Sequence, residues 1–552
     1  MDEHATITMY EKDEHVSFAN CGLPYYVGGE IVEREDLLVV KPELFERRFR
    51  INVRTLHEVT HVDRVRKVVH VLDRRTGRRF EDPYDKLILA PGAAPIVPPH
   101  VGPPPANVLT LRNVADSDRI RNAIVGPEPI QPRRPGAPLC AVIVGCGYVG
   151  LEMVEQMQNL GLKTTLVELV DQVLPLLDPE MGNLLRGELE DHGVELVLGD
   201  GVRAFHADDR GRVSQVELTS GRRLDADLVV LGIGVKPNTQ LAVEAELEIG
   251  SSGAIATNRH AQTSDRDIYA VGDAAEYFYL PTGTSHRIPL AGPANRAGRI
   301  AGEHATRDAA TQPTAPVLGT SIVRVFRKVA AMTGLTEKVA ARLGRPAASV
   351  VIAANDHAAY YPGASEMVLK LVYEPETGKV LGAQAIGGAE GVDKRIDVIA
   401  TAMHFGGTVR DLAGLDLAYA PPFGAAKDPV HVAAFVASNV LDGIVKLVPP
   451  GVDLRGIQAL DVRTAEEVAR RPVPVAPGTH HIPLDDLRDR IGELDPMLPT
   501  VVICATGRRS YVAARILMQR GFHDVASVVG GVMLRECVAH DCHALECEPG
   551  TS

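Results

Sequence analysis

The feature that most constrains this chain is a glycine-rich turn with the spacing G-x-G-x-x-G, at Gly145, Gly147 and Gly150. The apolar residues 141–145 before it predict a buried strand, and residues 151–157 after it have helical spacing. Glycines at these positions let the backbone approach a pyrophosphate, and the helix N-terminus favours its negative charge. The segment therefore predicts a Rossmann-like dinucleotide-binding domain with a parallel sheet.

An acidic residue supports this prediction and bears on the choice of nucleotide. Glu168 ends the next predicted strand, residues 164–167. A carboxylate there suits a free ribose 2'-hydroxyl, and residues 169–171, Leu-Val-Asp, offer no cation for a 2'-phosphate. The sequence therefore favours NADH, with NADPH left as a possibility. A glycine turn kept only for packing is the alternative, and the strand–turn–helix context argues against it.

A second nucleotide site is expected to be incomplete at its beginning. Residues 5–10 alternate like a strand and run into Glu11, which has the position of the acidic residue that ends a first βαβ unit. Its glycine turn belongs roughly 20 residues upstream, before Met1. The chain as given lacks the strand and turn that would hold the pyrophosphate of a flavin. We expect a start site upstream of Met1, with a damaged copy as the alternative.

Cysteine usage and charge limit the classes of function. Cys21 is a lone cysteine, since the next one is Cys140, so it must store an oxidised state as a mixed disulfide, a persulfide or a sulfenic acid. Seven cysteines in 552 residues are too few for a disulfide scaffold. The net charge of −13 disfavours nucleic-acid and anionic-membrane partners. Without a signal peptide or a membrane-spanning run, we expect a cytoplasmic protein with reduced thiols.

The segment around this cysteine has a familiar pattern. Residues 17–26, Ser-Phe-Ala-Asn-Cys-Gly-Leu-Pro-Tyr-Tyr, resemble the active-site segment of coenzyme A-disulfide reductases. These enzymes form the single-cysteine branch of the flavin-dependent pyridine nucleotide-disulfide oxidoreductases. The resemblance runs from residue 1 to about residue 445. It implies that Cys21 is the redox thiol and that Ser17 and Asn20 position the substrate.

The same resemblance implies cofactor and partner residues. Leu-Ala-Pro-Gly-Ala at 89–93 and Tyr-Ala-Val-Gly-Asp at 269–273 resemble flavin-site motifs, which assigns Gly92, Gly272 and Asp273 to FAD together with Glu11. Tyr-Tyr-Pro-Gly and Ala-Tyr-Ala-Pro-Pro resemble motifs that supply a tyrosine to the partner's active site in a homodimer. They match Tyr361 and Tyr419. Phe423 departs from the pattern, which has a tyrosine there.

The C-terminal part resembles a rhodanese domain. Residues 461–467, 481–484 and 504–510 carry the motifs in the usual order, and Cys504-Ala-Thr-Gly-Arg-Arg-Ser is the loop of interest. Such a loop wraps backbone N–H groups around a thiolate, which lowers its pKa and cradles a transferred sulfur. Arg508 and Arg509 add positive charge for the substrate. A buried structural cysteine at a strand end is the alternative.

Three cysteines near the end of the chain are candidate metal ligands. Cys537, Cys542 and Cys547 have spacings that fit no zinc pattern. We therefore predict a tail with exposed thiols and no metal site.

Together these patterns predict an α/β protein with two Rossmann-like nucleotide-binding domains, the first truncated at its N-terminus, an α+β dimerisation domain and a C-terminal α/β rhodanese domain. The expected boundaries are 1–125 and 257–312 for the two parts of the FAD-binding domain, 138–256 for the NAD(P)H-binding domain, 317–445 for the dimerisation domain and 453–552 for the rhodanese domain.

The expected activity is an FAD-dependent reduction, by NAD(P)H, of coenzyme A disulfide, coenzyme A persulfide or polysulfide through Cys21. Cys504 is expected to handle sulfane sulfur, and the partners are small thiol and disulfide substrates. Two alternatives stay open. One is an NADH oxidase or peroxidase that cycles a Cys21 sulfenic acid, and the other is a flavin-less sulfur carrier.

Overall fold

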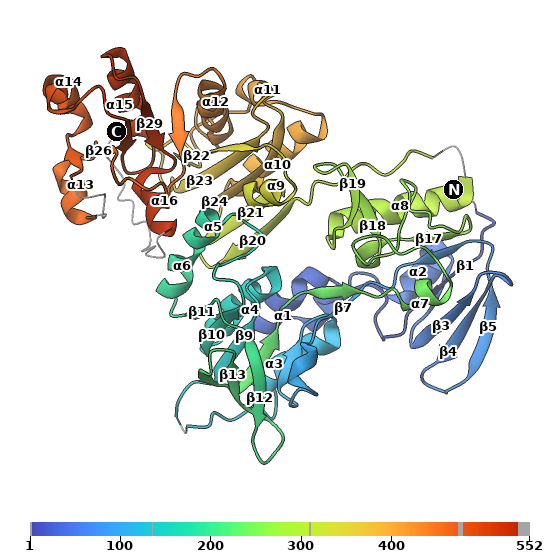
Figure 1. Cartoon of the computed structure of the whole chain (residues 1–552). Coiled ribbons are helices and arrows are strands. Elements are labelled where there is room, and N and C mark those ends of the chain that lie inside the picture. The colour runs from blue at the N-terminus through green and yellow to red at the C-terminus, as the bar shows by residue number, and fades with distance from the viewer. Residues whose placement is uncertain (1–2, 135, 308–310, 473–477, 539–552) are drawn as a thin grey trace. The chain divides into compact units, whose positions relative to one another are not determined.

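The computed structural model describes residues 3–134, 136–307, 311–472 and 478–538 (Figure 1). Its internal contacts divide the chain into two compact units. Unit 1 consists of Met1–Asp171 and Val194–Gly319, and unit 2 consists of Gln172–Gly193 and Thr320–Ser552. Each unit is described by itself.

The first sheet of unit 1 carries the glycine-rich turn. Its five strands are all parallel, in the order β11-β10-β9-β15-β8. The central strands are almost entirely buried and apolar, as a parallel sheet covered on both faces requires. Helices α3 (Val114–Val125) and α4 (Tyr148–Asn159) contact it. The strands are β8 (Val108–Thr110), β9 (Cys140–Val144), β10 (Lys163–Glu168), β11 (Glu195–Leu198) and β15 (Leu228–Leu231).

The expected flavin-binding part of unit 1 contains two separate parallel pairs in the described residues. Strand β1 (Ile7–Tyr10) pairs with β2 (Ile51–Arg54), and β17 (Ile268–Ala270) pairs with β6 (Leu87–Leu89). The residues of β17 lie in the buried core of this part, with Tyr10 packed against it. A single 3-10 turn at Gly272–Ala274 follows β17 and leads into strand β18 (Glu276–Tyr279).

The remaining elements of unit 1 are antiparallel strands and short helices. Two three-stranded antiparallel sheets and two strand pairs complete the unit. The strands are β3 (His57–Asp63), β4 (Val68–Asp73), β5 (Arg79–Pro83), β7 (Ala93–Pro95), β12 (Val202–Ala207), β13 (Val213–Leu218), β14 (Arg223–Asp225), β16 (Val235–Pro237) and β19 (Thr284–Arg287), and the helices are α1 (Leu23–Gly28), α2 (Pro42–Phe49), α7 (Gln240–Glu244) and α8 (Ala291–Arg307).

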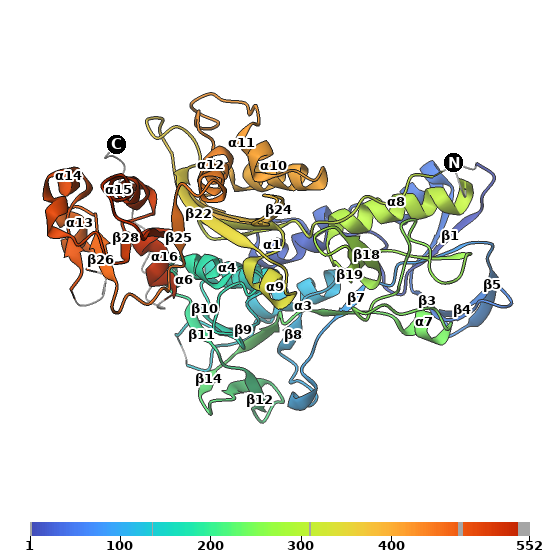
Figure 2. The same cartoon turned by 45° about the horizontal axis from the view of Figure 1, so that its top comes forward.

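Unit 2 begins with an antiparallel sheet in the order β20-β21-β24-β23-β22. Helices α10 and α12 pack on it, and they lie on the same face (Figure 2). The strands are β20 (Ser321–Val325), β21 (Lys328–Gly334), β22 (Ala348–Asn355), β23 (Glu366–Tyr373) and β24 (Val380–Gly387), and the helices are α5 (Pro179–Gly182), α6 (Arg186–Asp191), α9 (Glu337–Arg342), α10 (Val392–His404), α11 (Val409–Ala413) and α12 (Pro429–Leu441).

The C-terminal sheet of unit 2 is parallel, in the order β25-β29-β28-β26-β27. Its edge strand is formed by residues 446–448, which lie before the expected domain boundary at 453. The strands are β25 (Lys446–Val448), β26 (Gln458–Asp461), β27 (His480–His481), β28 (Thr500–Ile503) and β29 (Val525–Val528), and the helices are α13 (Ala465–Arg470), α14 (Leu487–Arg490), α15 (Arg508–Gln519) and α16 (Gly531–Val538).

None of the helices in the described ranges has the length and apolarity that a bilayer crossing demands.

Candidate functional site

Cys21 lies in a 3-10 turn, Asn20–Gly22, that leads directly into α1. Both Asn20 and Cys21 are exposed, and Ser17 is half-buried. The turn is fixed from below by a small apolar cluster that includes Leu23 and Leu37. The structure therefore presents the thiol at the surface of unit 1 on a well-supported turn.

Helix α1 carries this turn onto the helix that follows the glycine-rich motif. The Tyr25 hydroxyl donates a hydrogen bond to Glu152 of α4, at 3.1 Å. A Cβ at Gly28 would lie 1.7 Å from the Gln156 side-chain oxygen, so only glycine permits this approach. The sequence analysis did not identify this contact, because nothing in the local pattern of either helix shows which partner it meets.

The charges around Cys21 disfavour its thiolate. Burial by the surrounding chain raises the pKa of the Cys21 thiol, and the carboxylates of Glu152 and Asp273 raise it further. Two carboxylates from separate segments thus converge near one thiol. The chain by itself favours the neutral form of Cys21.

The expected flavin residues are partly assembled. The Arg112 guanidinium donates to the Asp273 carboxylate at 2.9 Å, and a Cβ at Gly92 would lie 3.1 Å from the same guanidinium. Gly272 has φ +78, and no atom lies within 4 Å of the position of its missing Cβ. Arg112 was not predicted as a site residue, because it belongs to no motif that the sequence made visible.

The fit to a flavin is therefore partial. Glu11 is half-buried, and burial raises the pKa of its carboxyl. With Asp273 it supplies acidic groups suited to hydroxyls, and Arg112 supplies a cation. Among the described residues, no glycine-rich turn accompanies β1 to cradle a pyrophosphate.

The glycine-rich turn after β9 fits a dinucleotide closely. Gly145 has φ +102, and a Cβ at Gly150 would lie 1.9 Å from the Gly145 carbonyl oxygen. Around Gly147, by contrast, no atom lies within 4 Å of the Cβ position. Two glycines are thus required by the fold, and the third leaves open space for a ligand at the N-terminus of α4.

Glu168 closes this turn from the end of β10. Its carboxylate accepts hydrogen bonds from the Cys146 N–H at 2.7 Å and from the Val170 N–H at 3.0 Å. The side chain is therefore held beside the glycine turn, where a ribose hydroxyl would meet it.

The two predicted tyrosines of unit 2, Tyr361 and Tyr419, are exposed. A third tyrosine, Tyr360, is the one whose hydroxyl contacts that of Tyr419. The Tyr360 and Tyr419 hydroxyls lie 3.2 Å apart, and this hydrogen bond raises the pKa of Tyr360. Tyr361 instead stacks edge-on with His357, with ring centroids 5.8 Å apart. Phe423, the departure from the expected pattern, is 73 % exposed. The adjacent tyrosines 360 and 361 could not be told apart from sequence.

A buried ion pair holds the two tyrosine loops together. Arg395 of α10 is 1 % exposed and binds the Asp428 carboxylate at 2.8 Å. The same guanidinium donates to the Asp356 carbonyl oxygen at 2.6 Å. Asp356 begins the loop that contains Tyr360, and Asp428 ends the loop that contains Tyr419. Sequence analysis missed Arg395, since its role depends on two distant segments.

The loop after β28 wraps around a buried thiol. Cys504 is 1 % exposed, and its sulfur accepts a hydrogen bond from the Gly507 N–H at 3.1 Å. Gly507 has φ +98 and forms the N-cap of α15. The carbonyls of Cys504 and Ala505 are bound by N–H groups of Val532 and Met533, at the start of α16. This geometry turns the Gly507 N–H and the N-terminus of α15 toward the sulfur.

The two arginines of this loop differ in their surroundings. Arg509 makes a two-pronged ion pair with Glu467, at 2.6 and 2.7 Å. Glu467 is itself fixed by a capping box with Thr464. Arg508 is exposed at the first position of α15. The structure thus distinguishes a structural arginine from one that faces solvent.

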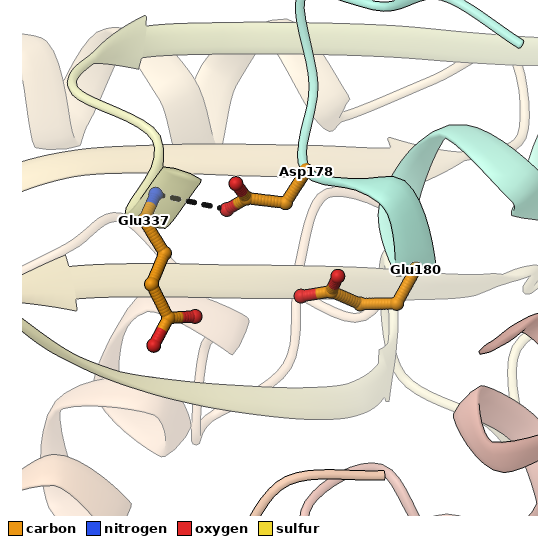
Figure 3. A group of neighbouring side chains, drawn as sticks. All are labelled: Asp178, Glu180 and Glu337. Carbon is orange, nitrogen blue, oxygen red and sulfur yellow. Dashed lines mark hydrogen bonds between the residues drawn. The ribbon is translucent and has the colours of Figure 1, made fainter. Parts of the chain in front are cut away.

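Three carboxylates of unit 2 lie close enough to suggest a metal site (Figure 3). They are Asp178, Glu180 and Glu337. The Lys370 ammonium is 2.8 Å from Asp178 and 2.7 Å from Glu337, and it also pairs with Glu180. A lysine therefore supplies the cation that these carboxylates share.

Of the three C-terminal cysteines, only Cys537 is among the described residues. It is 3 % exposed, and its carbonyl oxygen accepts from the Asn183 amide at 2.8 Å. The expectation of exposed thiols is therefore wrong for Cys537, because α16 packs against α5. Cys542 and Cys547 lie outside the described residues.

Comparison with known families gives three matches that together cover most of the chain. Residues 2–298 match the pyridine nucleotide-disulphide oxidoreductase model. The chain belongs to this family. Residues 320–429 match the dimerisation domain of the same family, and residues 452–534 match a rhodanese-like domain. The protein is an oxidoreductase, as predicted, and its α/β fold class is confirmed.

Individual relatives share the whole domain order or most of it. A coenzyme A disulfide reductase of Staphylococcus aureus (strain bovine RF122 / ET3-1) is 33% identical over 437 residues, which is 79% of this chain and 95% of the relative. The structure of reduced Bacillus anthracis CoADR-RHD has a TM-score of 0.90 and 41% identity, covering 98% of this chain and 94% of that one. A NAD-dependent persulfide reductase from A. fulgidus has a TM-score of 0.88 and 37% identity, with 97% and 96% covered.

Proposed function

We propose that this oxidoreductase uses NADH to reduce coenzyme A disulfide or coenzyme A persulfide, with FAD as the resident cofactor and Cys21 as the thiol that is alternately capped and freed. Cys504 carries sulfane sulfur in the same chain. The observation that carries the proposal is the position of Cys21 as an exposed free thiol at the start of α1. A lone thiol of this kind fits capping by a substrate fragment rather than an internal disulfide.

The roles of the chain's own residues follow from their positions. The Cys21 thiolate attacks one sulfur of the substrate, and the other sulfur leaves as a thiolate or hydrosulfide. Glu152 lies on the helix that contacts α1, where it opposes formation of the thiolate. Asn20 and Ser17 flank the cysteine and would position the substrate.

The cofactor residues have equally specific roles in the proposal. Glu11 and Asp273 would hold flavin hydroxyls, with Arg112, Gly92 and Gly272 close to the same site. A bound flavin supplies two-electron transfer between a nicotinamide and a thiol. Because the described residues provide no pyrophosphate turn at β1, flavin content is itself a test. A purified chain with a bound-flavin absorbance supports the reductase, whereas a colourless chain that still loads Cys504 with sulfur supports the carrier alternative.

The NAD side of the proposal rests on the glycine turn and Glu168. Gly145, Gly147 and Gly150 would approach the pyrophosphate, and the Glu168 carboxylate would accept from the ribose hydroxyls. A 2'-phosphate would meet that carboxylate with the same sign of charge, which favours NADH.

The decisive experiment measures NADH consumption with coenzyme A disulfide and with coenzyme A persulfide. Cys21→Ser should abolish turnover with both, because it removes the thiol that takes the capping group. Cys140→Ser is the matched control, since Cys140 is also a free thiol of unit 1 but belongs to strand β9. Undiminished turnover in Cys21→Ser refutes the assigned role. NADH consumption with dioxygen or with hydrogen peroxide, in the absence of a sulfur substrate, would support the oxidase or peroxidase alternative.

The exposed tyrosines are proposed to serve the active site of the other subunit in a homodimer. The dimerisation-domain match and the exposure of Tyr360, Tyr361 and Tyr419 support this role. A phenol with a pKa of about 10 can protonate a leaving thiolate when held close. Tyr360→Phe and Tyr361→Phe, compared at equal flavin content, identify which of the neighbours acts with Tyr419. Unchanged turnover in both of these variants and in Tyr419→Phe contradicts the proposal.

In the C-terminal domain, Arg508 is proposed as the cation that receives an anionic sulfur donor. Its exposure supports this role, while Arg509 is occupied by Glu467. Arg508→Ala should raise KM for thiosulfate in sulfur transfer to a thiol acceptor. Glu467→Gln should instead lower domain stability, because it weakens a two-pronged ion pair. An unchanged KM in Arg508→Ala overturns the assignment.

A further inference from the structure

A pair of buried hydroxyl groups lies directly beneath the Cys504 sulfur. Ser510 of α15 and Ser527 of β29 are 0% and 1% exposed. The Ser527 hydroxyl donates to the Ser510 oxygen at 2.8 Å, and the Cys504 sulfur lies 3.5 Å from that same oxygen. The sequence motif of the Cys504 loop ends at Ser510 but gives that serine no role, and Ser527 lies outside the motif.

The hydrogen bonds of the protonated state are fully accounted for. A serine hydroxyl offers one donor and two acceptor positions. Ser510 donates to the Gly507 carbonyl oxygen at 3.0 Å. It accepts from Ser527 and from the Cys504 S–H. Every position of the Ser510 hydroxyl is therefore occupied while the cysteine is neutral.

When Cys504 loses its thiol proton to solvent, the hydrogen bonds around it change, but each of these groups keeps a partner. The Ser510 hydrogen can rotate from the Gly507 carbonyl toward the sulfur, which has lost its own hydrogen. The Gly507 carbonyl keeps a partner, because the Tyr511 N–H also donates to it, at 3.2 Å. Ser527 continues to donate to Ser510. The Cys504 sulfur, the two serine hydroxyls and the Gly507 carbonyl therefore each have a hydrogen-bond partner in both states.

We propose that Ser510 and Ser527 form a two-position hydrogen-bond switch that stabilises the Cys504 thiolate. Ser510 contacts the sulfur in both states. Ser527 is a positioning residue, because its donated hydrogen occupies a Ser510 lone pair and leaves the Ser510 hydrogen free to turn to the sulfur. The switch goes beyond the proposed sulfur-carrying role of Cys504, on which its biological use rests.

The charged groups around the loop act alongside the switch. Arg508 and Arg509 come from α15, and Glu467 comes from α13. In the buried pair of Asp461 and Arg463, Asp461 ends β26 and Arg463 follows it. A serine-to-alanine substitution removes none of these charges. A change in the ionisation of Cys504 in the serine variants therefore reports the hydroxyls and not the charges.

The test is the pH dependence of Cys504 alkylation by iodoacetamide in the full chain, measured by mass analysis of the Cys504 peptide. The thiolate is the reactive form, so the midpoint of the rate profile gives the thiol pKa. Ser510→Ala should raise that midpoint by about one unit, which is about tenfold less thiolate below it. Ser527→Ala should raise the midpoint by a smaller amount, which corresponds to about threefold less thiolate below it.

A matched control separates this effect from a general loss of a buried hydroxyl. Thr500 of β28 is 1% exposed, donates to the Leu498 carbonyl at 3.0 Å and accepts from the Gln458 amide at 2.9 Å. Thr500→Val should reduce thermal stability without moving the Cys504 midpoint. The switch is overturned when Ser527→Ala leaves the midpoint at its original pH, or when Thr500→Val moves it equally.

The alkylation experiment tests the hydrogen-bond switch separately from the proposed sulfur-carrying function of Cys504. Failure of the unaltered chain to load Cys504 with sulfane sulfur would contradict the sulfur-carrying role. The alkylation midpoints would still measure the switch, since iodoacetamide needs only the thiolate.

Discussion

Replacing Lys370 by methionine should reveal how much of unit 2 depends on one buried cation. Lys370 is 1% exposed, and its ammonium lies 2.8 Å from Asp178, which is 2% exposed. Glu180 and Glu337 share the same ammonium, and Figure 3 shows these two carboxylates beside Asp178. Methionine has a similar length and fills much of the same space, so the main loss is electrostatic. Removing one partner of a buried ion pair costs about 3–5 kcal/mol.

The stability lost in Lys370→Met should depend on pH, and the direction of that dependence follows from the pKa of Asp178. Burial alone raises the pKa of Asp178, but Lys370 and the hydrogen bonds to the carboxylate overcome this and hold the pKa below its ordinary value. A carboxyl with a lowered pKa stabilises the fold above its unfolded pKa, and that stabilisation disappears as the pH falls through the folded pKa. In Lys370→Met the carboxylates repel one another near neutral pH and are neutralised by protons in acid. The gap between the two proteins should therefore shrink as the pH falls.

Thermal unfolding followed by circular dichroism measures this effect. A loss of about 3–5 kcal/mol corresponds to a fall of the order of 10 °C for a domain of this size. Lys446→Met is the control, because the Lys446–Asp524 pair is exposed and should contribute at most about 1 kcal/mol. The reasoning would be refuted if the two variants lost equal stability near neutral pH. It would also be refuted if the stability gap between Lys370→Met and the unaltered protein were as large at about pH 3 as near neutral pH.

Three further outcomes are expected. Glu168→Ala combined with Leu169→Arg should shift the ratio of kcat/KM from NADH toward NADPH by tenfold or more, about 1.4 kcal/mol, and an unchanged ratio contradicts the ribose assignment. Arg395→Met should lower thermal stability by about 3–5 kcal/mol and reduce turnover, and full turnover at normal stability would show that the clamp does not position the tyrosines. Glu152→Gln should lower the pKa of Cys21, so that its alkylation near pH 8 becomes faster; an unchanged rate contradicts the electrostatic assignment.

The glycine-rich turn could be identified from sequence for a simple physical reason. Gly150 is required by its contact with Gly145, five positions away, and Gly145 by its φ of +102, although a Cβ there would also meet the distant Gly232 carbonyl oxygen at 2.6 Å. Glu168 ends a strand whose register follows from the same βαβ unit. Backbone conformation and runs of buried apolar residues are local properties, so the sequence reveals them directly. The same holds for the Cys504 loop, whose backbone wraps around its own cysteine.

Features that depend on distant segments could not be predicted in this way. Arg112 meets Asp273, and Arg395 joins two loops, only because the fold brings remote residues together. Whether Tyr360 or Tyr361 contacts Tyr419 depends on the direction of each side chain, which the sequence of two adjacent tyrosines does not reveal.

By itself, the amino-acid sequence determined the domain order, the positions of the two candidate thiols and the glycine-rich turn, because each is a local pattern of backbone shape and polarity. Only the tertiary structure decided which charges surround those thiols, which tyrosine pairs with Tyr419 and which lysine neutralises the carboxylates of unit 2. Electrostatic and hydrogen-bond energies fall steeply with distance, and distances between remote residues exist only once the chain has folded.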